Sequence, residues 1–63
     1  MLRYEQIIKE YLEANNVKLL SMQNDRILIE INGDQKIYRL ELVEDRLIIK
    51  NVYSEIEYQI ELR

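Results

Sequence analysis

The spacing of apolar residues changes once along this 63-residue chain, at Asn15-Asn16, and that change limits the folds open to it. Before it, apolar side chains recur at the spacing of one helical face, at Tyr4, Ile7, Ile8, Tyr11 and Leu12. After it, apolar and polar residues alternate, as they do in β-strands. The pattern therefore predicts one amphipathic helix over about residues 2–15, with strands from there on.

The strand pattern has four short interruptions, which predict strands at about 17–22, 26–31, 36–43, 46–53 and 56–62. The interruptions are too short to hold crossover helices, so neighbouring strands must run antiparallel. We therefore expect a single α+β domain over residues 1–63, with the N-terminal helix packed on one face of a curled, antiparallel β-meander of four or five strands.

The register of this meander follows from its turns. Two-residue loops at Asn24-Asp25, Gly33-Asp34, Glu44-Asp45 and Ser54-Glu55 keep one set of alternating residues on one face. That inner face is apolar or Tyr at every position except Asn51. Its members are Leu20, Met22, Ile27, Ile29, Ile31, Tyr38, Leu40, Leu42, Leu47, Ile49, Asn51, Tyr53, Ile56, Tyr58, Ile60 and Leu62.

Such an inner face is difficult for one helix to cover. A helix about 10 Å wide spans only two or three strands spaced about 4.8 Å apart. A chain of this length also buries only about 60% of its unfolded surface, and without Cys it has no disulfides to reinforce it. We therefore expect either a strongly curled sheet or a second copy of the chain that supplies the missing cover.

Composition argues against several functional classes. A net charge of −3 and a pI near 4.9 disfavour binding to nucleic acid through phosphate contacts. The sequence lacks His and Cys, has one Gly and shows no cofactor or metal motif, so we expect no cofactor and no enzymatic activity. It contains no apolar run long enough for a membrane span and no signal-peptide pattern, which favours an intracellular, cytoplasmic protein.

The predicted outer face carries a candidate interface. Leu28, Ile37, Ile48 and Val52 fall there and would form one apolar patch across three strands. A contiguous exposed patch on a small protein commonly marks an interaction site. The alternative is that these residues serve strand propensity alone, with the stems of charged side chains covering them.

A candidate polar row lies on the inner face, where the register places Asn51 between Tyr38 and Tyr58. An amide between two phenols could bind a polar group of a small ligand. The competing interpretation is structural, with the amide satisfying Tyr hydroxyls or backbone groups near a sheet end.

These observations favour a small, non-catalytic protein-interaction module that forms a homodimer or binds another protein. The contact would use the outer patch or a free edge strand, 17–22 or 56–62. One alternative is an accessory protein of the viral or mobile-element type that binds and inhibits a host protein. A second is a small-ligand binder that uses the Tyr38, Asn51 and Tyr58 row.

Overall fold

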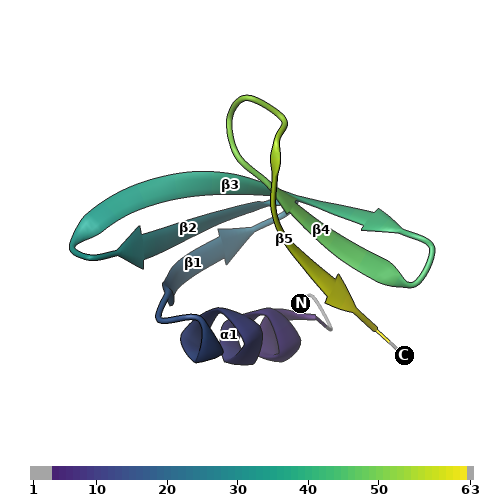
Figure 1. The fold of residues 1–63 in the computed structure, drawn as a ribbon, viewed down its shortest axis with the longest axis horizontal. Helices are drawn as coiled ribbons and strands as arrows, with labels where there is room; N and C mark the ends of the chain where they lie inside the picture. Colours follow the sequence, from purple (N-terminus) through teal and green to yellow (C-terminus); the bar gives the residue numbers. More distant parts are fainter. Residues whose placement is uncertain (1–3, 63) are drawn as a thin grey trace.

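A computed structural model describes residues 4–62, which form one helix and a five-stranded antiparallel sheet (Figure 1). The strands follow one another in the sheet in the order β1-β2-β3-β4-β5. This arrangement confirms the predicted α+β meander. The element bounds are α1 Glu5–Ala14, β1 Lys18–Gln23, β2 Arg26–Ile31, β3 Asp34–Val43, β4 Arg46–Lys50 and β5 Ile56–Glu61.

Helix α1 ends where the spacing of apolar residues changes. The Asn16 N–H donates to the Glu13 carbonyl, and Val17 N–H donates to the Leu12 carbonyl at 2.8 Å. Asn16 has a φ of 63°, a left-handed conformation that Asn tolerates better than most residues. The chain thus reverses into β1 at the predicted place, whereas residues 2 and 3 of the predicted helix lie outside the described part.

Three hairpins have two-residue loops. Asn24-Asp25 and Glu44-Asp45 are the predicted loops, but the middle hairpin turns at Asn32-Gly33, one residue earlier than expected, because Ile31 pairs with Asp34. Asn32 and Gly33 have φ values of 51° and 87°, so the two loop residues that best accept positive φ occupy these positions. The shifted loop is still even, so the predicted faces of β2 and β3 are unchanged.

The last hairpin differs from the prediction. Strand β4 ends at Lys50, and a five-residue loop, 51–55, replaces the expected turn at Ser54-Glu55. Glu57 is then an extra residue in β5, because Ile49 pairs with Tyr58 and Lys50 with Ile56. The odd loop and the bulge compensate for each other, so Tyr58 and Ile60 still face inward as predicted. The prediction was wrong for Tyr53 and Ile56, which are both exposed.

A second bulge corrects the predicted face of one residue in β1. Leu19 pairs with Ile29 and Ser21 with Leu28, which leaves Leu20 as the extra residue. Leu19 therefore packs against the core, whereas the prediction placed Leu20 there. Nothing in the composition of β1 marks the bulge, because adjacent leucines fit either register.

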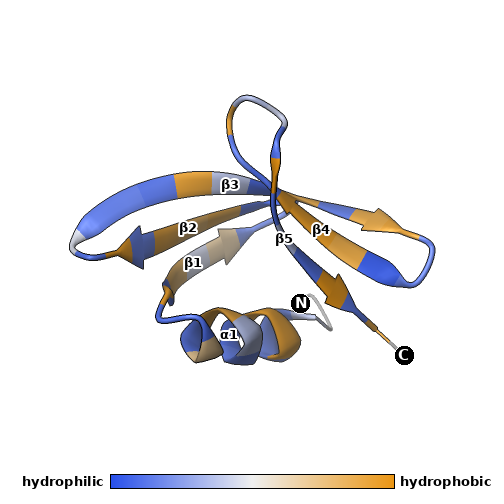
Figure 2. Cartoon of the chain, viewed as in Figure 1, coloured by the Kyte–Doolittle hydropathy of each residue, from blue (hydrophilic) through white to orange (hydrophobic). Residues whose placement is uncertain are grey.

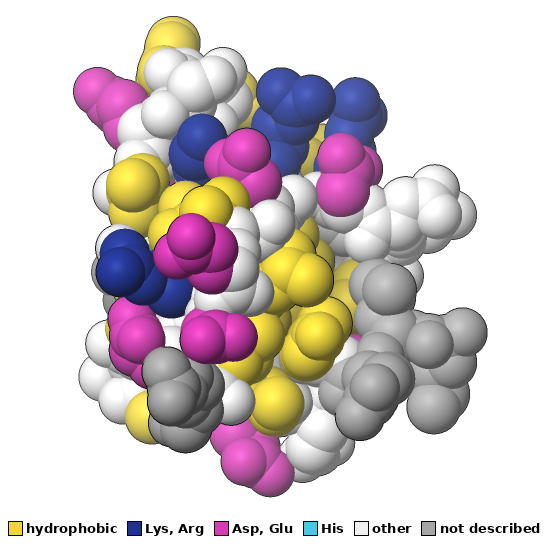
Figure 3. Space-filling model, turned by 90° about the vertical axis from the view of Figure 1, so that its right-hand side faces the viewer, with side chains coloured by type: hydrophobic (Ala, Val, Ile, Leu, Met, Phe, Trp, Pro, Cys, Tyr) yellow, Lys and Arg dark blue, Asp and Glu magenta, His cyan; other side chains and the backbone are white. Residues whose placement is uncertain are grey.

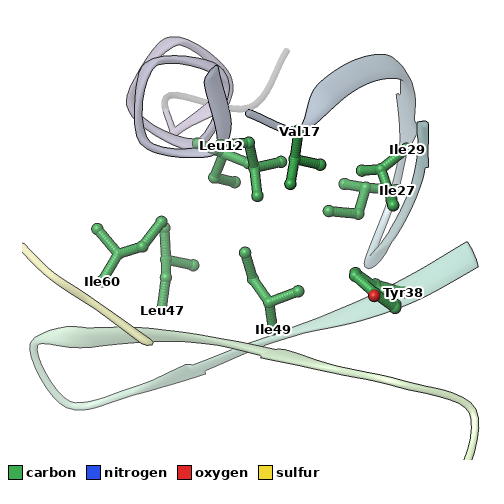
Figure 4. Close-up of a cluster of buried hydrophobic side chains, with 9 residues drawn as sticks. Leu12, Val17, Ile27, Ile29, Tyr38, Leu47, Ile49 and Ile60 are labelled. Carbon is green, nitrogen blue, oxygen red and sulfur yellow. The ribbon is translucent and has the colours of Figure 1, made fainter. Parts of the chain in front are cut away.

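The sheet curls around α1, and because of this curl a single helix covers much of the inner face. The ten-residue β3 pairs with β2 along its first half and with β4 along its second half, so the two halves of the sheet meet at an angle above the helix (Figure 1). Side chains from both halves converge with those of α1 on one core (Figure 4). Its members are Ile8, Leu12, Val17, Ile27, Ile29, Tyr38, Leu47, Ile49 and Ile60.

The inner face of β3 is nevertheless buried to different degrees along the strand. The first half of this strand is mostly hydrophilic (Figure 2), and Lys36 is exposed although it pairs with the buried Ile29. On the second half, Leu40 is half-buried and Leu42 is exposed, although both occupy inner-face positions. The core thus forms below the middle of the sheet, and the ends of β3 extend beyond it.

Candidate interaction surfaces

The loop between β4 and β5 is braced by the side chain of Asn51. Its Oδ1 accepts hydrogen bonds from the backbone N–H groups of Tyr53, at 2.8 Å, and Glu55, at 3.0 Å. Its Nδ2 donates to a carboxylate oxygen of Glu55 at 3.0 Å and to one of Glu57 at 2.8 Å. The backbone adds a bond from Asn51 N–H to the Glu55 carbonyl. The Asn51 side chain and these backbone bonds together hold the shape of the loop.

The braced loop presents apolar side chains to solvent. Val52 is 70% exposed and Tyr53 is 80% exposed. Ile37 of β3, which is 53% exposed, lies with both residues around a shallow hollow of about 330 Å³. Leu28 extends this surface, since it pairs with Ile37 across β2 and β3. We refer to Leu28, Ile37, Val52 and Tyr53 as the loop patch.

Of the predicted interface residues, Ile48 does not join the loop patch. It lies on the predicted outer face, opposite Glu41 on one side and Gln59 on the other, but it is only 7% exposed. The Lys50 ammonium bonds to Glu41 at 2.7 Å beside it, and the stems of these long side chains can shield Ile48. The sequence pattern therefore predicts the face on which Ile48 lies, but it does not predict that Ile48 is buried.

The predicted polar row is only partly assembled. The rings of Tyr38 and Tyr58 lie 6.4 Å apart at their centroids, and Tyr11 of α1 meets Tyr58 edge-on at 6.0 Å. Asn51 instead uses its amide in the loop, which favours the structural interpretation of this residue over a ligand-binding one. Burial, and then the Glu57 carboxylate, raise the pKa of both Tyr38 and Tyr58 above the ordinary 10.0.

A separate apolar hollow of about 250 Å³ lies near the start of α1. Figure 3 shows apolar side chains near the centre of one face of the molecule, with charged side chains above, below and to the left of them. Leu40 and Leu42, which occupy inner-face positions on the second half of β3, contribute apolar side chains to this hollow. Its lining residues are Tyr4, Ile8, Asn24, Asp25, Leu40, Leu42 and Leu47.

Charged residues pair across neighbouring strands, and several of them line a hollow of about 230 Å³ formed by Asp25, Arg39, Leu40, Glu41, Lys50 and Ser54. Arg46 and Glu61 approach to 3.5 Å and Lys50 and Glu41 to 2.7 Å, all across neighbouring strands. Among residues 4–62, no group of three or more acidic side chains is placed to hold a metal ion. Within the same residues, α1 is too short and too polar to cross a membrane.

Comparison with known proteins adds no assignment: no family model, curated protein or solved structure matches the chain. The strand pattern predicts Tyr53 in the core, which is wrong, and it does not predict the brace formed by Asn51. The available signal was the polar run from Ser54 after Asn51, because Asn commonly bonds to backbone groups two to four residues onward in loops.

Proposed function

We propose that this chain is a protein-interaction module without catalytic activity, and that it self-associates through the loop patch. The observation that carries the proposal is the braced loop, which holds Val52 and Tyr53 out in solvent beside Ile37. Exposed aliphatic side chains of a disordered loop would carry little meaning. Here the loop is fixed by hydrogen bonds, and the same side chains form one continuous surface with the outer face of the sheet.

Preorganisation gives this surface an energetic advantage in binding. Ordering an interface side chain costs about 0.5–1.5 kcal/mol on association, and a loop already held in place avoids much of this cost. Tyr is also among the residue types enriched at the energetic centres of interfaces, because it combines a large apolar area with few rotatable bonds. Tyr53 is therefore the natural anchor of the loop patch.

The charges around the loop patch support a second copy as the partner. The hollow beside Ile37 and Val52 is lined by Lys36 and by Glu57, so cationic and anionic groups flank the same apolar centre. A two-fold axis that passes between Lys36 and Glu57 would place each Lys36 towards the Glu57 of the other copy. Interfaces between identical subunits require such self-complementarity, because both copies contribute the same patch.

A partner of a different kind is the alternative, including a host protein bound by an accessory protein of the viral type. Tyr53 and Val52 would serve either partner, so the oligomeric state of the isolated chain separates the two. Sedimentation equilibrium at micromolar to millimolar concentration is the direct experiment. We expect a concentration-dependent dimer, and a monomer at every concentration contradicts self-association.

Matched substitutions then locate the contact. Val52→Asp places a charge in the loop patch, whereas Val43→Asp places the same charge on another exposed Val, at the end of β3. We expect Val52→Asp to shift the equilibrium towards monomer and Val43→Asp to leave it unchanged. A dimer lost in the Val43 variant and kept in the Val52 variant would assign the contact to the opposite end of the sheet.

A further inference from the structure

Among residues 4–62, strand β5 is the last strand of the sheet and pairs only with β4, which leaves its other side free for hydrogen bonding. The Leu62 N–H donates to the Asp45 carbonyl at 2.8 Å, which fixes the alternation of bonds along this pair. Main-chain groups of Tyr58, Ile60 and Leu62 therefore face β4, and those of Gln59 and Glu61 face away from it. These outward groups form a template for another strand.

The two edges of the sheet differ in how well they suit strand addition. The bulge at Leu20 lies in the middle of β1 and interrupts that edge, which is a common protection against pairing. The bulge at Glu57 lies near the start of β5 and leaves residues 58–61 in regular pairing with β4, and the bond from Leu62 to Asp45 continues this pattern. The accessible edge is therefore that of β5.

The side chains of β5 define what a complementary strand must carry. On the outer face, Gln59 is followed by Glu61, whose ion pair with Arg46 leaves its side chain 65% exposed. On the inner face, Tyr58, Ile60 and Leu62 are apolar and pack against the core. Opposite charges directly across neighbouring strands attract, and like charges repel. A strand that pairs with this edge should therefore carry cationic side chains on the outer face of the sheet and apolar side chains on the inner face.

From this geometry we infer that β5 binds an extended segment of another protein by antiparallel strand addition, and that Lys or Arg alternates with apolar residues in that segment. A second copy of the chain fits this edge poorly, because pairing β5 with itself brings two acidic edges together on chains that each carry a net charge of −3. The inference goes beyond the proposed function, since it concerns a different surface and a different partner.

Synthetic peptides test the inference with the full chain. A seven-residue peptide of alternating Lys and Val, labelled for fluorescence anisotropy, is compared with an alternating Glu and Val peptide and with a scrambled peptide of the same Lys and Val composition. We expect saturable binding of the alternating Lys peptide alone. Equal binding of the scrambled peptide would reduce the effect to charge attraction, and no binding of the alternating peptide at millimolar concentration would overturn the inference.

Backbone methylation separates strand addition from contact through side chains. In the antiparallel arrangement, the N–H groups of the Lys residues face β5, because residues paired through hydrogen bonds share one face of the sheet. N-methylation of the Lys residues should therefore abolish binding, and N-methylation of the Val residues should preserve it. The reverse result, or no effect of either change, contradicts antiparallel addition.

A charge reversal in the protein completes the test. Glu61→Lys should weaken the alternating Lys peptide by about two- to fivefold and strengthen the alternating Glu peptide. Glu13→Lys, an exposed reversal on α1, changes the net charge equally and should have the smaller effect on both peptides. Equal effects of the two variants would contradict a site on β5.

Discussion

Leu42 and Leu47 lie directly opposite each other on β3 and β4, on the same face of the sheet, yet Leu47 is 3% exposed and Leu42 is 52% exposed. Both leucines line the hollow at the start of α1, but only Leu47 belongs to the core that contains Ile8 and Leu12. Curling of the sheet thus buries the inner face of β4 against α1, whereas the end of β3 stays exposed to solvent.

Truncation of these two leucines should have very different effects. Leu47→Ala removes buried methyl groups and leaves a cavity, so we expect a loss of about 2–5 kcal/mol in the free energy of unfolding. Leu42→Ala removes groups that already contact water, and we expect a loss below about 1 kcal/mol. Urea unfolding followed by circular dichroism measures both, and similar losses would show that Leu42 is covered in solution.

Ile48 and Ile37 provide a similar comparison on the outer face. Ile48→Glu places a carboxylate beside Glu41 at a buried position, so we expect it to unfold most of the protein at room temperature. Ile37→Glu lies in the exposed loop patch and should leave the fold intact while weakening self-association. Thermal melting combined with sedimentation distinguishes these effects. If Ile48→Glu remains folded, position 48 is accessible to solvent and the prediction of its burial is wrong.

Glu44 occupies a backbone conformation that its residue type disfavours. Its φ of 55° equals that of Asn24 in the first hairpin and is close to the 51° of Asn32 in the second. Left-handed conformations cost a residue with an ordinary side chain about 1 kcal/mol, and Asn pays less. We expect Glu44→Asn to stabilise the fold by about 0.5–1 kcal/mol. Glu44→Gln removes the same charge without this preference, and an equal gain from it would attribute the effect to charge.

Most of the fold could be predicted because the apolar period and the turn residues act locally. Asn16, Asn24 and Gly33 each accept positive φ where a chain reversal needs it, and the two-residue loops transmit the register between strands. The bulges at Leu20 and Glu57 could not be predicted, since an extra residue in a strand is selected by the curl of the whole sheet. The wrong faces predicted for Leu19, Leu20 and Ile56 follow from these two bulges.

The candidate surface was harder to predict than the fold. Leu28 and Ile37 were placed correctly because they lie in regular strands. The burial of Ile48 depends on how the side chains of Glu41 and Lys50 lie over it, which no period in the sequence records. The strand pattern continues through Tyr53 and so predicts this residue in the core, whereas β4 ends three residues earlier, where the hydrogen bonds of Asn51 form the loop.

Alkaline pH should destabilise the protein through the phenols of Tyr38, which is buried, and Tyr58, which is half-buried. Burial, and next Glu57, raise the pKa of Tyr38 and Tyr58 in the folded state, so the fold favours their neutral forms. This contribution to stability is fully present below about pH 10 and is lost as pH rises through the raised values. Tyr58→Phe should reduce the loss, and Tyr53→Phe, at an exposed ring, should not. Urea unfolding at pH 8 to 11 measures this, and identical slopes for both variants would contradict it.

Asn51 links the stability of the fold to the proposed function, because the residue that braces the loop also positions Val52 and Tyr53. Asn51→Ala removes every side-chain hydrogen bond of the brace, and we expect a loss of about 1–2 kcal/mol, since these bonds are exposed. Asn15→Ala is the control, because it removes a single exposed bond, from Nδ2 to the Tyr11 carbonyl.

Self-association provides the second measurement on the same variants. If the loop patch is the contact, Asn51→Ala should weaken the dimer under conditions where the variant is still folded, because Val52 and Tyr53 must then be ordered on binding. Asn15→Ala should leave the dimer unchanged. An Asn51 variant that loses stability but retains full association would show that the brace serves the fold alone, and the contact would then have to lie elsewhere on the chain.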